Sequence, residues 1–210
     1  MNKKGTIMIL TGLLLIAAAL CLTAYNFWDS SRAGNNAQEA LELLLPEIPE
    51  PIPMPEPLSQ DDDPDEIEYP DYVINPNMEM PVKTIDGIDY IGTLSIPALE
   101  LELPVISQWS YPGLQVAPCR YVGSVYMDDL CICAHNFTRH FGNLKNLSIG
   151  DEVVYTDMDG NVFHYQVGEV TILDPTAIDE MVHSEWDLSL FTCTLGGRTR
   201  VTVRCEKIEE

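Results

Sequence analysis

Short runs of alternating apolar and polar residues, separated by turn residues, fill the chain from about Val82 onward. Alternation of this kind places successive side chains on opposite faces of a β-strand. Eight such runs, from YIGTLSIP to TRVTVRCE, follow one another with few helical segments between them. Many short strands with few helices predict an all-β fold, here a closed eight-stranded β-barrel with short helices over residues 82–210.

The N-terminal residues predict a membrane anchor. Lys3 and Lys4 precede an uncharged, mostly apolar run from Gly5 to Trp28, which is long enough to cross a bilayer as a helix. Basic residues before the run and acidic residues after it favour a start inside the cell and a remainder outside it. We therefore expect residues 1–28 to form a cytoplasmic start and an uncleaved single-pass transmembrane signal-anchor in the cell membrane, with the barrel extracellular. A cleaved signal peptide is the alternative.

Residues 29–81 are predicted to form an extracytoplasmic stalk rich in proline and acidic residues. The run NNAQEALELLLPE predicts a short helix with Leu41, Leu44 and Leu45 on one side. Proline then stands at nearly every second position over residues 46–57, which favours an extended polyproline II conformation. The acidic run after it has too little apolar surface to fold alone, so we expect a solvated linker, and a lid over the active site is the alternative.

The charge of the chain narrows the choice of partners. Its formal net charge is −22, from 33 acidic and 11 basic residues. No basic stripe is available for a phosphate backbone, so we expect no nucleic-acid partner. Anionic lipid headgroups would also repel the acidic domain, so membrane contact is expected through the anchor.

The stretch SLFTCTLGGRTRVTVRCE at residues 189–206 carries the candidate nucleophile. Cys193 ends one alternating strand, and Arg200 opens the next strand after a Gly-Gly turn. A cysteine attacks as its thiolate, so it needs a proton acceptor or a positive neighbour. An arginine beside it can stabilise an oxyanion or hold a substrate carbonyl. We expect Arg198 and Arg204 to be solvated surface charges.

Four histidines compete for the role of base. His135 closes the apolar run DLCICAHNF at a strand end, which makes it the preferred candidate. His140 lies in the loop-like TRHFGNL and ranks second. His164 falls within an alternating strand at a position expected to be exposed, and His183 follows a helical stretch.

Several separate motifs, in the same chain order, resemble the sortases, a family of cysteine transpeptidases of Gram-positive bacteria. SLFTC differs from the family signature T-L-x-T-C only in its first residue, and CAHNF keeps the alanine beside the histidine. YIGTLSIPALELELPV is similar to the family's I-G-x-I-x-I-P…L-x-L-P-V, and HFGNLKNLSIGDEV to its F-x-x-L-x-x-L-x-x-G-D. The resemblance covers about residues 88–207 and leaves the sortase class open.

The resemblance implies a sortase-type barrel and assigns roles to four residues. Cys193 would cleave an LPxTG-like sorting signal of a surface protein and hold it as a thioester. His135 would protonate the leaving amine and then deprotonate the acceptor amine. Arg200, with Arg198 as the alternative, would stabilise the oxyanion, and Thr192 would bind the peptide. The implied acceptor is a peptidoglycan precursor or a pilin lysine, and no cofactor or metal is implied.

Two other functions remain open from the residues alone. A hydrolytic cysteine peptidase of the cell envelope, of the EC 3.4.22 type, would use the same groups with water in place of the amine. A catalytically silent peptide-binding domain would use the same groove without chemistry. Loss of activity with retained peptide binding in Cys193→Ala separates an enzyme from a binder.

The remaining cysteines are not assigned to bridges. Outside the membrane the chain has an odd number of cysteines, so at least one is free, and the pairing of the others is open. Cys131 and Cys133 are too close along one strand for an unstrained bridge. A zinc site from Cys133, His135 and Cys193 lacks the C-x-x-C spacing of such sites, so we predict no metal. The four thiols other than the nucleophile are Cys119, Cys131, Cys133 and Cys205.

Overall fold

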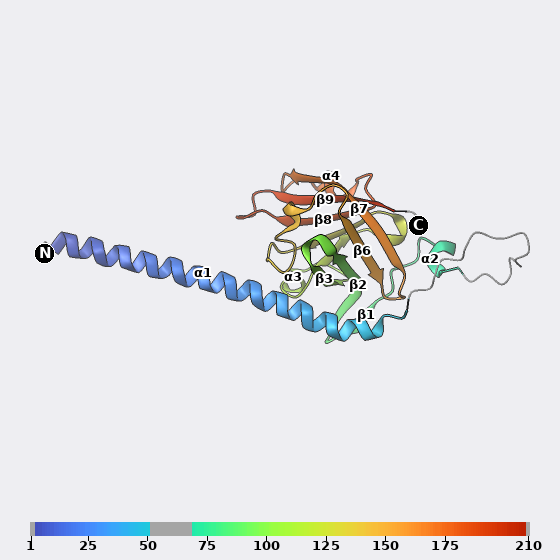
Figure 1. Ribbon diagram of the computed structural model, residues 1–210, viewed down its shortest axis with the longest axis horizontal. Coiled ribbons are helices and arrows are strands. Elements are labelled where there is room, and N and C mark those ends of the chain that lie inside the picture. Colours follow the sequence, from blue (N-terminus) through green and yellow to red (C-terminus); the bar gives the residue numbers. More distant parts are fainter. Residues whose placement is uncertain (1–2, 51–68, 209–210) are drawn as a thin grey trace, which may run out of the picture.

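The computed structural model describes residues 3–50 and 69–208. One long helix, α1 (Lys3–Leu44), extends away from a barrel at its N-terminal end and runs along the barrel with its C-terminal part (Figure 1). The strands are β1 (Lys83–Ile85), β2 (Ile88–Ile96), β3 (Leu101–Ile106), β4 (Cys119–Val122), β5 (Leu130–Ala134), β6 (Glu152–Asp157), β7 (Val162–Leu173), β8 (Leu188–Cys193) and β9 (Arg200–Lys207). The short helices are η1 (Leu45–Glu47), α2 (Asp71–Ile74), η3 (Pro97–Leu99), α3 (Tyr111–Leu114), η4 (Val125–Met127), η5 (Leu144–Asn146) and α4 (Ile178–Val182).

Eight of these strands form a closed ring. The strand order is β1-β2-β3-β4-β5-β8-β9-β7-β6, and a further pairing between β2 and β6 closes the barrel. The strand β1 is hydrogen-bonded only to β2 and lies outside the ring. The closed eight-stranded barrel predicted from the alternating runs is therefore confirmed. Two of the pairings, β3 with β4 and β5 with β8, are parallel.

The alternation along β8 and β9 sorts side chains between the barrel interior and its outer face. Leu188 and Leu190 of β8, and Val201 and Val203 of β9, are buried in the main hydrophobic core. Residues at an odd number of positions from these point the opposite way, because successive side chains of a strand face opposite sides. Cys193 and Arg200 therefore lie on the outer face.

The helix α1 continues well past the predicted end of the anchor. Its residues from Ala33 onward pack against the barrel through a face with helical spacing. Leu41 and Leu44 are buried as part of this face, whereas Leu45 is exposed in η1. The first part of the predicted stalk is thus a helix that lies on the barrel and not a spacer. The buried residues are Ala33, Ala37, Ala40, Leu41 and Leu44.

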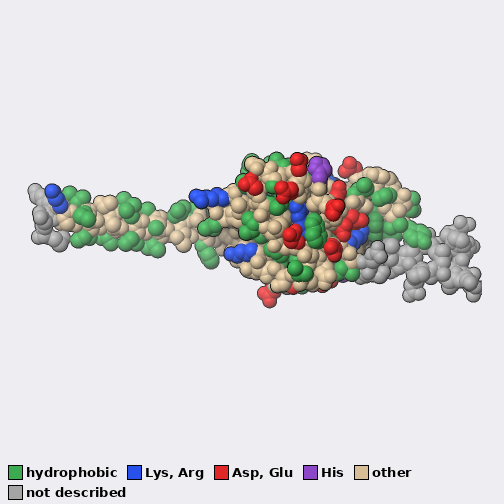
Figure 2. All heavy atoms as spheres, turned by 90° about the horizontal axis from the view of Figure 1, so that it is seen from above, with side chains coloured by type: hydrophobic (Ala, Val, Ile, Leu, Met, Phe, Trp, Pro, Cys, Tyr) green, Lys and Arg blue, Asp and Glu red, His purple; other side chains and the backbone are tan. Residues whose placement is uncertain are grey.

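The apolar part of α1 has the properties of a membrane span. The helix is long and apolar enough to cross a bilayer, a property that it shares with a signal sequence. Figure 2 shows hydrophobic and uncharged atoms along the free part of this helix, while the acidic side chains gather over the barrel. Three points stay predictions. They are the end of the anchor at residue 28, the start of the barrel domain at residue 82, and the placement of the chain's start inside the cell and of the barrel outside it.

The chain before β1 also belongs to the packed body. The ring of Tyr72 in α2 stacks on Tyr126 with centroids 5.0 Å apart, and Met80 is buried in the main core. Packing therefore begins before residue 82. The acidic run, with the proline run from Pro51 onward, lies outside the described residues.

Candidate active site

Two neighbouring strands of the barrel, β5 and β8, end at the candidate site, and a third, β9, begins there. The strands β5 and β8 are parallel, and Ala134 pairs with Thr192. His135 directly follows Ala134, and Cys193 directly follows Thr192. These two residues therefore stand side by side at the ends of β5 and β8. Cys193 pairs with Arg200 across the antiparallel β8–β9 hairpin. The structure thus brings the three residues predicted for catalysis together.

The side chains of these three residues share the outer face of the sheet. Ile132 and Ala134 of β5 belong to the interior core, which leaves Cys133 and His135 on the other face. The same alternation turns Cys193 and Arg200 outward on β8 and β9. All three side chains are partly exposed. Solvent therefore reaches all three side chains.

Thr192 points the other way. Its side chain is 4% exposed, and its hydroxyl donates a hydrogen bond of 2.8 Å to the carbonyl of Ala134. This bond ties β8 to β5 one residue before Cys193 and His135. We assign Thr192 a positioning role from this geometry, and its predicted contact with the peptide stays a prediction.

His135 lies in a half-buried environment that favours its neutral form. Loss of water contact lowers the pKa of the imidazole, and the Asp29 carboxylate on α1 opposes this shift. The Gln115 amide nitrogen lies 3.0 Å from Nε2. An amide nitrogen only donates, so Nε2 accepts and the neutral ring carries its proton on Nδ1. A neutral imidazole is able to accept a proton from a thiol or an amine.

Cys193 differs from the other thiols of the barrel in its accessibility. The thiols of Cys119, Cys131, Cys133 and Cys205 are buried, and burial raises the pKa of each. A thiol with a raised pKa stays protonated near neutral pH and is a poor nucleophile. Cys193 is only partly buried, and no cysteine is in a disulfide in the part of the chain described. No group of three metal-ligating residues occurs there either.

The hairpin after Cys193 holds the guanidinium of Arg200. Its Nη1 donates to the carbonyls of Gly197 at 3.0 Å and Thr199 at 3.1 Å. These bonds fix the cation at the mouth of the hairpin, next to the strand end that carries the thiol. Arg198 is exposed on the turn itself, further from the paired strand ends.

The prediction that Arg204 is a solvated surface charge is wrong. The side chain is 4% exposed, and Nη1 donates to the hydroxyls of Ser189 at 2.6 Å and Ser184 at 3.3 Å. Its Nη2 also donates to the carbonyl of Glu180. The segment of residues 174–187 folds over the outward side of β9 and covers a position that strand alternation alone leaves open. Ser189, the first residue of SLFTC, is therefore an acceptor for this arginine.

The other histidines do not reach the strand ends. His140 is fully buried, with Nε2 3.4 Å from the carbonyl of Ala33 in α1, and burial lowers its pKa to about 4. Nδ1 of His164 lies 3.0 Å from Oε1 of Glu152 on the neighbouring strand, and the imidazole of His183 is exposed. Of the four, His135 alone stands at the end of β5.

Comparison with known proteins decides the family. The sequence profile of the Sortase domain matches residues 94–208, which is more than half of the chain and contains all three outward residues. The chain belongs to the sortase family. Among the curated proteins, no relative matches this sortase.

Solved sortase structures share the fold. "Sortase C1 of GBS Pilus Island 1" has a TM-score of 0.51 and 23% identity over 58% of this chain and 65% of that one. The sortase C1 of Streptococcus suis has a TM-score of 0.50 and 27% identity over 58% and 74%. A Clostridium perfringens "Sortase D5 transpeptidase" has a TM-score of 0.51 and 19% identity over 60% and 83%. The chain thus spans less than two thirds of the first of these proteins.

A contact between α1 and the active-site loop was not predicted from the sequence. The hydroxyl of Ser30 accepts from the backbone N–H of Thr138 at 3.3 Å, and Asn35 accepts from Arg139 at 2.7 Å. Both partners lie in the loop that follows His135. A run such as DSSRAGNN carries no strong helical periodicity, so the continuation of the helix has no clear signal in the sequence.

Aromatic side chains extend from the site along the outer face. Phe191, two residues before Cys193 on the same face, meets Tyr121 edge-on with ring centroids 5.3 Å apart. The ring centroid of Tyr121 lies 6.0 Å from that of Trp109, and the ring centroid of Trp109 lies 5.7 Å from that of Tyr111. Trp109 and Tyr111 are exposed, so this row offers apolar surface next to the thiol.

Proposed function

We propose that this sortase is a cysteine transpeptidase that cleaves an LPxTG-like sorting signal and transfers the surface protein to an amine. The observation that carries the proposal is the convergence of Cys193, His135 and Arg200 on the outward ends of three adjacent strands. Membership of the family and its transpeptidase chemistry agree with this arrangement. A sortase named for a pilus island shares the fold, which supports a pilin lysine as one acceptor to test beside a peptidoglycan precursor.

The reaction begins with attack by the Cys193 sulfur on the carbonyl between threonine and glycine of the signal. The half-buried His135 takes the thiol proton, and the resulting imidazolium then protonates the leaving amine as the C–N bond breaks. The acyl group remains on sulfur as a thioester. An incoming amine attacks that carbonyl, His135 accepts its proton, and the C–S bond breaks.

Arg200 supports the step in which negative charge develops on the carbonyl oxygen. Its guanidinium is held by two carbonyls of its own hairpin and so does not have to be ordered during the reaction. A fixed cation beside a developing oxyanion lowers the barrier because little reorganisation is needed.

The test uses the full chain in detergent with a panel of LPxTG-like peptides. We expect a covalent adduct, read by intact mass, that disappears when an amine is added and a ligated peptide is formed. Cys193→Ala should form none, whereas Cys21→Ala, which removes an exposed thiol on α1, should behave as the wild type.

Three results contradict parts of the proposal. An adduct that is released at the same rate with and without amine supports the hydrolytic peptidase. Peptide binding without any adduct in the wild type supports the silent binding domain. An adduct that persists in Cys193→Ala excludes this thiol as the nucleophile.

A further inference from the structure

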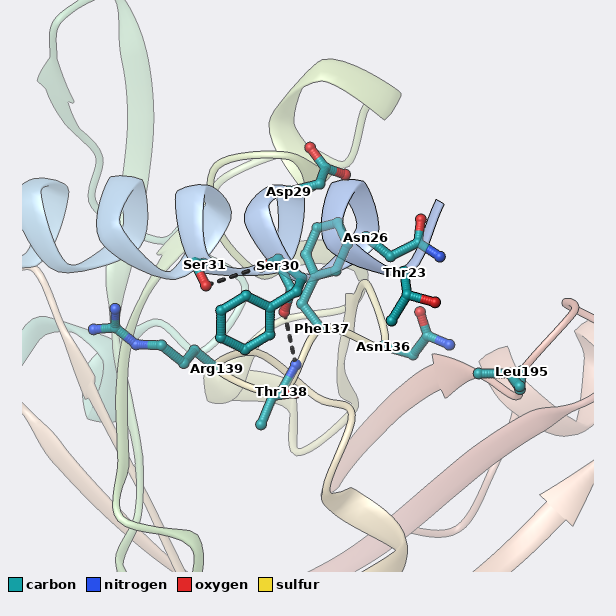
Figure 3. Close-up of a pocket in the computed structure, with 11 residues that line it drawn as sticks. Thr23, Asn26, Asp29, Ser30, Ser31, Asn136, Phe137, Thr138, Arg139 and Leu195 are labelled. Carbon is teal, nitrogen blue, oxygen red and sulfur yellow. Dashed lines mark hydrogen bonds between the residues drawn. The ribbon is translucent and has the colours of Figure 1, made fainter. Parts of the chain in front are cut away.

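A cavity of about 710 Å³ lies between α1 and the loop after His135. Figure 3 shows α1 along one side of it, the loop of residues 136–139 across from the helix, and Leu195 at the edge nearest the β8–β9 hairpin. A volume of this size is in the range of sites that hold a ligand. The hydrogen bonds from Thr138 to Ser30 and from Arg139 to Asn35 join the two walls, so the cavity is preformed.

The lining of the cavity includes residues that neighbour both reacting groups of the proposed mechanism along the chain. Asn136 and Phe137 follow His135 directly, and Leu195 is two residues beyond Cys193. The carbonyl side of the scissile bond has to lie on the sulfur of Cys193, and the amine side has to lie within reach of His135, which gives it a proton. The wall beside His135 therefore borders the amine side of the substrate.

The far end of the cavity leads toward the apolar part of α1. Thr23, Asn26 and Phe27 line it there, within the stretch that we predict to span the membrane. A peptide that enters the cavity beside His135 and follows α1 arrives at the membrane surface.

The lining fits an uncharged, extended main chain. The amides of Asn26 and Asn136 and the hydroxyl of Ser31 lie in the lining together with the aromatic ring of Phe137. The two charged side chains of the lining already have partners, because Asp29 accepts from Arg32 at 2.6 Å and Arg139 donates to Asn35. Peptide groups need hydrogen-bond partners when they leave water, and this lining supplies them.

We propose that this cavity binds the peptide segment on the amine side of the scissile bond. The inference rests on the proposed transpeptidase function and deepens it. The segment that departs with the amine occupies the cavity during acylation, and the acceptor amine enters along the same path, because the second half of the reaction reverses the first. In acylation the C–S bond forms and the C–N bond breaks, and the amine leaves with a proton from His135. In the second step the C–N bond to the acceptor forms, the C–S bond breaks, and His135 takes the proton of the acceptor amine.

The experiment narrows the cavity from both walls in the full chain, reconstituted in detergent or nanodiscs. Leu195→Trp changes a side chain that is 93% exposed, so it spares the fold, and Ser31→Trp enters from α1. Leu43→Trp is the matched control, since Leu43 is on the same helix, is 48% exposed and does not line this cavity. Each protein is given one signal peptide with a single glycinamide after the scissile bond and another extended there by about ten residues, roughly 35 Å of chain.

We expect both cavity variants to lower kcat/KM for acylation by the extended peptide about tenfold or more, as overpacking of a preformed site does. The short peptide should react as with the wild type, and Leu43→Trp should match the wild type with both peptides. In the second step, the variants should slow release by a bulky peptide amine more than release by glycinamide.

Equal losses for the short and extended peptides, or no loss for either, overturn the inference while leaving the proposed function intact. A wild type that forms no thioester with either peptide refutes the proposed function, and the inference fails with it. The two failures are therefore distinguishable in one data set.

Discussion

Acidification should weaken the protein through His140, the buried imidazole that joins the active-site loop to α1. Its Nε2 lies 3.4 Å from the Ala33 carbonyl, so Nε2 carries the proton, and Nδ1 has no hydrogen-bond partner among the described residues. A second proton on Nδ1 would place an unpaired charge in the interior. Burial accordingly lowers the pKa of His140 to about 4.

The size of the effect follows from the two pKa values. The unfolded chain takes up a proton at His140 below about pH 6.5, while the folded chain does so only near pH 4. Stability from this group is therefore complete above pH 6.5 and falls as the pH drops through that window. The loss is about 2 kcal/mol at pH 5 and about 3 kcal/mol in full.

The assay compares urea unfolding of the full chain in detergent at pH 8 and pH 5. His140→Gln removes the titration and keeps an amide donor, so its free energy of unfolding should fall about 2 kcal/mol less than that of the wild type between these pH values. His183→Gln, which changes an exposed histidine, should follow the wild type. Equal pH dependence in His140→Gln and the wild type would refute the reasoning.

Four further changes probe the supports of the site. Thr192→Val removes the bond to the Ala134 carbonyl and should cost about 1–2 kcal/mol in urea unfolding; unchanged stability contradicts the positioning role. Arg204→Met breaks the buried bonds to Ser184 and Ser189 and should cost about 2–3 kcal/mol, whereas no cost would mean that the arginine is solvated. Ala37→Leu overfills the α1–barrel contact and should cost about 1–3 kcal/mol, with faster proteolysis near residue 37; full protection would argue against the contact. Asp29→Asn removes a charge that raises the pKa of His135, so the His135 limb of the kcat/KM–pH profile should move to lower pH, and a shift upward contradicts the sign.

The barrel and the three outward residues were predictable because their patterns are local. Alternation along SLFTC and RTRVTV assigns each side chain to a face, and a strand end is visible where a thiol or an imidazole meets a turn. That both ends lie side by side needed the parallel β5–β8 pairing, which joins residues 58 positions apart. Alternation within a strand does not show which strands pair, so it was the resemblance to the family that predicted these residues to lie together.

Long-range packing explains what the sequence analysis missed. Ala33, Ala37 and Ala40 are small and give little signal as a hydrophobic face, yet they allow α1 to lie close against the barrel. Arg204 was assigned to the surface because alternation points it outward, and only the fold of the preceding segment buries it. Gln115 and Asp29 reach the neighbourhood of His135 from elements distant in sequence, which no local pattern encodes.

The most direct test of the central claim follows the fate of the acyl group on Cys193. The full chain is incubated with an LPxTG-like peptide and a peptide amine, and the ligated and hydrolysed products are quantified over time by mass spectrometry. The account predicts a ligated product that grows with amine concentration at the expense of hydrolysis, in the wild type and not in Cys193→Ala. Cleavage that yields only the hydrolysed peptide at every amine concentration would contradict it.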